Sequence, residues 1–165
     1  LAWGVGLILR QHGHKPSDLT PVAVGLSSFL LGPVLLVNVI MKPGFGRPRP
    51  FWTTEFGHTK DYALPGSFSE QCSGNCSFVS GEAAGWFWVF WIVPFLPIAW
   101  RSKAALLLLL PAVGFSFLRV VFGRHYLSDI SIAAALSLLV VALCGWFFTS
   151  GVGRRLLAIA STRSH

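Results

Sequence analysis

Long apolar runs, separated by short polar segments, form the dominant pattern of this chain. The runs cover residues 21–41, 83–100, 104–122 and 130–149. A helix needs about 20 mostly apolar residues to cross the hydrocarbon core of a bilayer. Each run satisfies that length closely enough to form one helix, so the pattern predicts four membrane spans.

The first residues of the chain form a shorter apolar run. LAWGVGLIL has nine residues before Arg10, and the sequence shows neither an initiator Met nor a signal-peptide pattern. We interpret this run as the remnant of a further span whose beginning is missing. Residues 1–165 are therefore expected to form a single membrane-embedded domain.

The composition agrees with a membrane protein. Hydrophobic residues make up 53% of the chain and charged residues 12%, with a mean hydropathy of +0.64, whereas soluble domains carry about 25% charged residues. A soluble enzyme with buried helices is the alternative, but it would need far more polar surface than this chain can supply. The expected fold class is an all-α, polytopic transmembrane helical bundle.

The basic residues predict how the bundle is oriented. If the four runs span the membrane, segments 10–20, 101–103 and 150–165 share one side and carry seven basic residues against one acidic residue. The other side receives segments 42–82 and 119–129, with six basic and five acidic residues. An excess of Lys and Arg marks the cytoplasmic side. We expect the long polar segment to lie on the opposite side of the membrane from the cytoplasm.

That polar segment, residues 42–78, is rich in Gly, Pro, Ser and aromatic residues. It is longer than most connections, which favours a functional role. Its opening KPGFGRPRP contains residues that interrupt helices, so the first span is expected to end at Met41. The aromatic side chains would either cover a large lipid headgroup or rest at the membrane interface; they are Phe51, Trp52, Phe56 and Tyr62.

The three cysteines leave two alternatives open. Cys72 and Cys76 flank Ser-Gly-Asn in the segment assigned to the outside, where a disulfide would form in an oxidising compartment. The same pair would otherwise bind a metal, although no second pair supplies the remaining ligands of a zinc site. Cys144 falls in the last run and is expected to serve packing.

Polar residues gather at the outer ends of different spans. They form three clusters: Lys42 with Arg49, the turn Ser80-Gly81-Glu82, and Arg119 with His125 and Asp129. Cationic side chains and the free N–H groups of a helix N-terminus both bind phosphate oxygens. The clusters therefore predict a phosphate site at the mouth of the bundle, with backbone N–H groups of Ser80 and Gly81 completing it.

His125 and Asp129 are four residues apart, which places them on one face of a helix. The carboxylate would accept a hydrogen bond from one imidazole nitrogen and leave the other free to act as a nucleophile. The alternative is that Ser128 or Asp129 caps a helix and His125 merely lies at the interface.

Two spacings carry a resemblance to a known family. Lys42 is followed after six residues by an Arg-Pro pair at Arg49, and Arg119 is followed by five residues, His125, three residues and Asp129. In both spacings the chain resembles the type 2 phosphatidic acid phosphatase superfamily, which shares its site with vanadium haloperoxidases. The resemblance implies a helical-bundle phosphatase in which His125 attacks phosphorus, Asp129 orients it, and water hydrolyses a phosphohistidine.

The chain departs from that family at two positions. Leu118 stands where the family usually has Ser, and the family's Pro-Ser-Gly-His reads here as Val-Ser-Gly-Glu, which ends at Glu82. Ser80 and Gly81 match as phosphate-holding residues, whereas Glu82 replaces the His that protonates the leaving alkoxide. Three interpretations of this replacement stay open. Glu82 is the general acid; or His58 is the acid while Glu82 holds a phosphate-binding cation; or the protein binds phosphate without turnover.

The resemblance also implies the substrate class. The enzyme would hydrolyse a phosphate monoester or pyrophosphate of a membrane lipid, such as lipid A, undecaprenyl pyrophosphate, phosphatidylglycerol phosphate or phosphatidic acid. Its phosphate would be held by Lys42, Arg49, Ser80, Gly81 and Arg119 without metal or organic cofactor. The expected partners are this lipid and the bilayer, not nucleic acid, and the oligomeric state stays open. The alternative is an inactive protein that binds or transports phosphate lipids.

Overall fold

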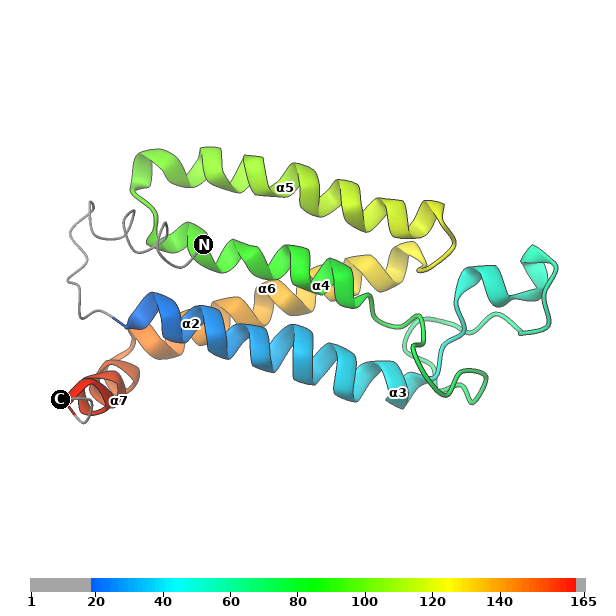
Figure 1. Cartoon of the computed structure of the whole chain (residues 1–165), viewed down its shortest axis with the longest axis horizontal. Helices are drawn as coiled ribbons and strands as arrows, with labels where there is room; N and C mark the ends of the chain where they lie inside the picture. Colours follow the sequence, from blue (N-terminus) through cyan, green and yellow to red (C-terminus); the bar gives the residue numbers. More distant parts are fainter. Residues whose placement is uncertain (1–18, 163–165) are drawn as a thin grey trace.

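The computed structural model describes residues 19–162 and contains no strand within them (Figure 1). The predicted remnant span at the start of the chain lies outside the described residues. The long helices lie side by side in an elongated bundle, with an irregular segment projecting from one end. The elements are α2 (Thr20–Phe29), η1 (Leu30–Met41), α3 (Lys42–Phe45), η2 (Pro50–Trp52), η3 (Thr54–Phe56), α4 (Gly81–Trp88), η4 (Val89–Phe95), α5 (Ile98–Val121), α6 (Leu127–Thr149) and α7 (Gly151–Thr162).

Three helical stretches in the described part of the chain are long and apolar enough to cross a membrane. They are Thr20–Trp52, Ile98–Val121 and Leu127–Thr149. These stretches contain the first and fourth of the predicted apolar runs, and all but the last residue of the third. The chain is therefore an all-helical integral membrane protein, as the sequence predicts.

The predicted span over residues 83–100 is wrong at its end. The helix formed by α4 and η4 ends at Phe95, and α5 already begins at Ile98. Pro94 lies inside η4 and Pro97 is the N-cap of α5. Proline lacks the backbone N–H and disfavours helical conformation in the residue before it, so the two prolines divide the apolar run between two helices.

The first span also ends later than predicted. The helix continues past Met41 through α3 and ends at Phe45. Pro43 lies inside this continuous helix, where it supplies no backbone N–H but does not end the helix. Gly46 then adopts a left-handed conformation with φ of 57°, which is the usual end of a helix at glycine. Lys42 thus projects from a helix rather than from a loop.

Small side chains bring α4 and α6 together in the centre of the bundle. Ala83, Ala84 and Ala133 are completely buried, and Ser137 Oγ donates to the Ala84 carbonyl at 2.7 Å. Close approach of small residues and hydrogen bonds between helices are the usual means of helix association in a bilayer. This contact fixes the start of α4 beside the start of α6, where the polar clusters lie.

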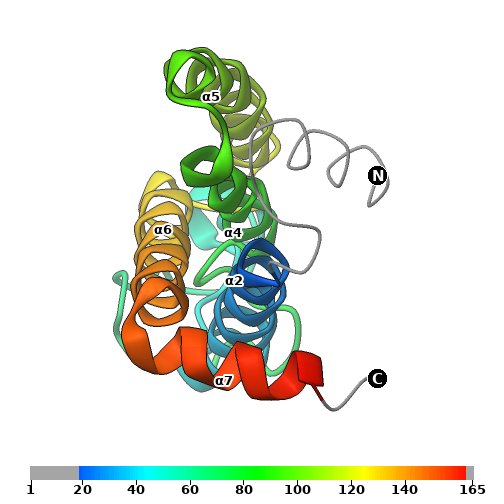
Figure 2. The same ribbon diagram turned by 90° about the vertical axis from the view of Figure 1, so that its left-hand side faces the viewer.

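The helices differ in how much of their surface the bundle covers. α5 lies at the edge of the bundle and exposes most of its apolar side chains, as expected of a lipid-facing helix (Figure 1). α7 crosses the end of the bundle near the start of α2 and the end of α6 (Figure 2). The start of α5 and α7 lie at the same end, opposite α3 and the irregular segment. The two elements carry Arg101, Lys103, Arg154 and Arg155.

Candidate active site

His125 occupies the turn between α5 and α6. α5 ends at Val121, Gly123 has φ of 62°, and α6 begins at Leu127. The prediction that His125 and Asp129 share one helical face is therefore wrong, because His125 precedes the helix. The His125 side chain is nevertheless 2% exposed. Its backbone N–H donates to the Arg119 carbonyl at 3.1 Å, which ties the turn to the last turn of α5.

The imidazole of His125 is oriented by a backbone carbonyl. Nδ1 lies 2.8 Å from the carbonyl oxygen of Ser77 and 3.7 Å from Asp129 Oδ2. The first distance is a hydrogen bond and the second is too long for one. Because a carbonyl only accepts, Nδ1 carries a proton, and in the neutral form of the ring Nε2 keeps its lone pair. The expected hydrogen bond to Asp129 is thus replaced by one to Ser77.

The carboxylate of Asp129 is already fully engaged. Asp129 is completely buried, and its Oδ1 accepts from Arg47 Nη1 at 2.5 Å. Oδ2 accepts from the Ser77 hydroxyl and, at 3.0 Å, from the Tyr126 N–H at the N-cap of α6. The Asp129 side chain therefore caps the start of α6 and also lies next to His125.

Arg47 is a central residue that the motif spacing did not select. It is completely buried and, besides Asp129, donates to the Ala63 carbonyl at 2.8 Å and to Ser128 Oγ at 3.0 Å. Its guanidinium also lies 3.8 Å from the ring centre of Tyr126. Burial raises the pKa of Tyr126, so the phenol remains neutral beside the cation. The family spacing selects only Arg49. The sequence feature that could have pointed to Arg47 is the repeated Arg-Pro pair in GRPRP.

Lys42 and Arg49 meet at a single residue, Asn75. Lys42 Nζ donates to the Asn75 side-chain oxygen at 3.1 Å, and Arg49 Nε donates to the Asn75 backbone carbonyl at 2.9 Å. Lys42 is also close enough to Arg49, Glu82 and Arg119 for their charges to interact. The first and third motifs are therefore brought together at one end of the bundle.

Glu82 lies beside a cation of the third motif. Its Oε2 is 2.9 Å from Arg119 Nε, and the Glu82 side chain is 54% exposed. The distance is that of an ion pair, although the Arg119 N–H is not aligned for a hydrogen bond with the carboxylate. Lys42, Arg49 and Arg119 together form a cation cluster. The half-exposed carboxyl group of Glu82 lies beside it.

Ser80 joins the start of α4 to the start of α6. It is the N-cap of α4, where its hydroxyl accepts from the Ala83 N–H at 3.3 Å. The Ser80 N–H donates to the Asp129 carbonyl at 3.3 Å, so in this structure that N–H is already paired. The N–H of Gly81 belongs to the first turn of α4, whose N–H groups have no partner within the helix.

The aromatic residues of the polar segment 42–78, called the outer segment from here on, contact the arginines of the site. Arg124, an exposed cation that the motifs do not include, lies 4.7 Å from the ring centre of Phe51, and Arg49 lies 6.0 Å from that of Trp52. Tyr62 lies 5.4 Å from the Arg47 guanidinium. Such contacts between cations and rings are attractive, so these rings help to form the site.

His58 and His125 line different cavities. His58 borders a cavity of about 410 Å³ together with Trp52, Lys60, Glu70 and Asn75. His125 borders a mostly apolar cavity of about 440 Å³ between the end of α5 and the outer segment, which Phe56 also lines. The described structure thus leaves the predicted alternative acid, His58, in a different cavity from His125.

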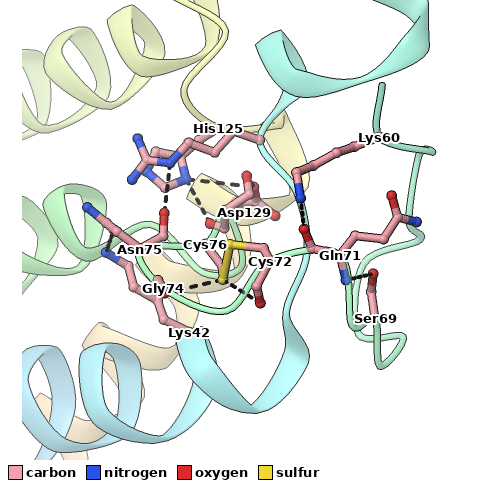
Figure 3. The surroundings of a disulfide bond; sticks show 12 residues. Lys42, Lys60, Ser69, Gln71, Cys72, Gly74, Asn75, Cys76, His125 and Asp129 are labelled. Atoms are coloured by element: carbon pink, nitrogen blue, oxygen red, sulfur yellow. Dashed lines mark hydrogen bonds and ion pairs between the residues drawn. A yellow bond between two sulfur atoms is a disulfide. The ribbon is translucent and has the colours of Figure 1, made fainter. Parts of the chain in front are cut away.

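Cys72 and Cys76 form a disulfide with a Cα separation of 5.7 Å (Figure 3). The disulfide alternative of the sequence is therefore confirmed. Cys144 is a free, buried cysteine in α6. Figure 3 shows Asn75 beside Lys42, with the disulfide between this pair and Gln71.

Comparison with known families decides where this arrangement belongs. Residues 22–151 match the family described as the PAP2 superfamily, which is the type 2 phosphatidic acid phosphatase superfamily. The chain belongs to the PAP2 superfamily. All the paired residues described above lie within this PAP2 region, and the family predicted from the sequence is confirmed.

The PAP2 relatives of this chain include three proteins named lipid A 4'-phosphatase. The protein from Rhizobium etli is 38% identical over the whole chain and that from Rhizobium leguminosarum 36%, with 60% and 66% of their own lengths covered. The protein from Francisella tularensis subsp. novicida is 38% identical over 61% of the chain and 46% of its own length. The chain thus spans less than two thirds of these relatives. No solved structure matches it.

Proposed function

We propose that this chain is the membrane-embedded phosphatase region of a PAP2 enzyme that removes a phosphate group from a lipid of the lipid A type. The observation that carries the proposal is His125, whose Nε2 is free while Nδ1 is held by the Ser77 carbonyl. The turn that carries His125 is hydrogen-bonded to the Arg119 carbonyl, which joins this nucleophile to the helix end that supplies one of the proposed phosphate-binding cations. The names of the relatives support the substrate class.

The phosphate would be bound by side chains from three parts of the chain. Lys42, Arg49 and Arg119 supply positive charge, and the Gly81 N–H points from the start of α4. Arginine pairs its N–H groups with phosphate oxygens, and charge on the oxygens of a transferred phosphoryl group is what such a site must stabilise. The cations would perform this task without a metal ion.

The reaction would proceed in two displacements. His125 Nε2 attacks phosphorus, the bond to the lipid oxygen breaks, and a phosphohistidine forms. Water then attacks phosphorus, which releases inorganic phosphate and restores the imidazole. The positive charge of the phosphorylated ring would be stabilised by the Ser77 carbonyl and by Asp129, 3.7 Å from Nδ1.

Glu82 is our proposed proton donor to the leaving lipid oxygen. Its half-exposed carboxyl group stands where the family has a proton-donating His, and Arg119, 2.9 Å away, places it next to a phosphate-binding residue. The carboxylate would take up a proton from solvent, which its exposure permits, and pass that proton to the lipid oxygen as the bond to phosphorus breaks. The contact with Arg119 also supports a second role, in which Glu82 holds Arg119 for phosphate binding and does not transfer a proton. The two roles differ in their effects on kcat and KM.

Two cavities support a large, amphipathic substrate. The polar cavity of about 410 Å³ borders Asn75, which contacts two phosphate-binding residues. It would accommodate the sugar of a lipid A headgroup. The apolar cavity of about 440 Å³ reaches His125 and would accommodate acyl chain. Undecaprenyl pyrophosphate, phosphatidylglycerol phosphate and phosphatidic acid are the other substrates to compare.

The compartment is also a proposal. We place the protein in the bacterial inner membrane with the site facing the periplasm. The basic residues of α5 and α7 lie at the opposite end of the bundle from the site, as the positive-inside rule requires. The Cys72–Cys76 disulfide next to the site suits an oxidising compartment.

The test is phosphate release by the detergent-purified protein from these four lipids, with His125→Ala as the comparison. We expect release from the lipid A substrate and none from the variant, with phosphate trapped on His125 in the wild type after acid-free quenching. Release by the variant at the wild-type rate would overturn the proposal.

Glu82→Gln separates the two roles of Glu82. If Glu82 is the acid, the variant loses kcat by about 100-fold or more, the usual range for general acid catalysis, with little change in KM. If Glu82 only holds Arg119, the variant keeps kcat and raises KM, and the proposed proton transfer is overturned.

A further inference from the structure

The loop closed by the disulfide, residues 72–76, contacts the cation cluster through one residue. Asn75 accepts a hydrogen bond from Lys42 Nζ with its side-chain oxygen and one from Arg49 Nε with its backbone carbonyl. Lys42 and Arg49 repel each other, because their charges are close enough to interact. Two oxygens of one residue, the side-chain oxygen for Lys42 and the backbone carbonyl for Arg49, offset that repulsion and orient both side chains.

We propose that Asn75 is a positioning residue for the two phosphate-binding cations and that the Cys72–Cys76 disulfide holds it in place. The inference rests on the proposed function, since it assigns Lys42 and Arg49 to phosphate binding. Asn75 itself touches no reacting atom in this scheme. It acts through the two cations, which it holds in position before the phosphate binds.

The neutrality of Asn75 is part of the argument. A carboxylate at this position would bind Lys42 more tightly, but it would cancel the charge that attracts phosphate and would repel the substrate directly. A neutral amide oxygen orients the Lys42 ammonium group without competing with phosphate for its charge. Asn75 is also exposed at the surface of the site, so its side chain has no packing role that would explain it.

The disulfide restricts the loop at both sides of Asn75. Cys76 is completely buried, and the next residue, Ser77, donates its N–H to the Arg47 carbonyl at 2.8 Å. Cys72 is tied to Cys76 across the short turn, so Asn75 has little freedom to leave the cations (Figure 3). Without the sulfur bond, residues 72–75 would be anchored only at their ends, and the order of Lys42 would decrease.

The first experiment is a mutant cycle between Asn75 and Lys42, read as kcat and KM for the lipid substrate. Asn75→Ala is expected to raise KM about tenfold, the effect of one hydrogen bond to a charged group, and to change kcat less. Because Asn75 acts through Lys42, the same substitution in a Lys42→Ala background should have no further effect. Asn75→Asp should raise KM more than Asn75→Ala does.

Thr54→Ala is the control, since Thr54 is an exposed residue between Lys42 and Phe78 that lines neither of the two cavities. It should leave both constants unchanged. An Asn75→Ala effect that is equally large in the Lys42→Ala background would overturn the positioning role. So would an unchanged KM in Asn75→Ala, provided that Lys42→Ala itself raises KM.

The second experiment addresses the disulfide. Dithiothreitol should raise the KM of the wild type and should have no effect on the Cys72→Ser/Cys76→Ser double variant, whose KM is already raised. Cys144→Ser, at the free cysteine of α6, should respond to the reductant as the wild type does. A reduced wild type with unchanged KM would overturn this part of the inference, and the melting temperature of each protein checks that it is folded.

A binding measurement distinguishes a failure of the proposed function from a failure of the positioning role of Asn75. If the wild type releases no phosphate from any of the four lipids, the proposed function fails. The positioning role is then measured by calorimetry with inorganic phosphate as the probe. Weaker binding by Asn75→Ala, again absent in the Lys42→Ala background, would support the inference, and equal binding by the wild type and Asn75→Ala would overturn it.

Discussion

At the scale of single residues, the buried pair of Arg47 and Asp129 determines how the site is built. Both side chains are almost completely shielded from solvent, and they meet at 2.5 Å. Removal of one partner of such a pair leaves a buried charge without compensation, which costs about 3 to 5 kcal/mol. Arg47 also holds the Ala63 carbonyl and Ser128, so its loss would affect the outer segment and α6 together.

Arg47→Ala is therefore expected to lower the stability of the protein by about 3 kcal/mol or more and to abolish phosphate release. Arg47→Lys keeps the charge but cannot reproduce the planar set of donors, so it should retain only part of the stability and activity. Thermal denaturation in detergent and phosphate release measure the two effects. Arg154→Ala, an exposed arginine of α7, is the control; a loss of equal size there would contradict the role of the buried pair.

The residues of the site differ in how far the sequence predicts them. Lys42, Arg49 and Arg119 were found because motif spacing is a local property of the chain, and the structure brings them together with Glu82. Ser77 and Asn75 were not found, because their contacts with His125 and Lys42 depend on how the outer segment folds back over the helices. Short-range patterns carry no information about such contacts.

At the scale of the elements, glycine decides how α3 ends. Gly46 has φ of 57°, and a Cβ built on it would lie 1.7 Å from the Ser69 carbonyl oxygen. Gly57 also has a positive φ, of 80°, but a Cβ there meets no atom within 4 Å. The two positions share the cost of a left-handed conformation, about 1 to 2 kcal/mol for residues with a Cβ, and differ in steric conflict.

Gly57→Ala is thus expected to cost about 1 kcal/mol and Gly46→Ala distinctly more, because the Ser69 backbone must move. Since α3 carries Lys42, Gly46→Ala should also raise KM for phosphate release, whereas Gly57→Ala should not. Melting temperature and steady-state kinetics give both results. Equal destabilisation by the two substitutions would show that the Ser69 contact does not matter.

The same scale shows why one predicted span failed. Hydropathy alone treats residues 83–100 as one apolar run, and the structure divides it at Pro94 and Pro97. The prediction gave too little weight to Pro94 and Pro97 and too much to Pro43, which lies inside a helix that continues to Phe45. The presence of a proline in the sequence therefore does not by itself determine where a helix ends.

At the scale of the whole molecule, the distribution of charge relates the bundle to the membrane. Arg101 and Lys103 at the start of α5, and Arg154 and Arg155 in α7, lie at one end. The cation cluster and the disulfide lie at the other end. The excess of Lys and Arg at the first end is the feature by which the positive-inside rule predicts a cytoplasmic location for that end.

This orientation predicts the result of two fusions expressed in a bacterium. A green fluorescent protein fused after Thr162 should fluoresce, because it stays in the cytoplasm, and alkaline phosphatase fused after Gly66, in the outer segment, should be active because it reaches the periplasm. Replacing Arg101, Lys103, Arg154 and Arg155 by Gln should weaken both signals, since these residues supply the charge bias. Active alkaline phosphatase after Thr162, with an inactive fusion after Gly66, would reverse the assignment and move the phosphate site to the cytoplasmic side.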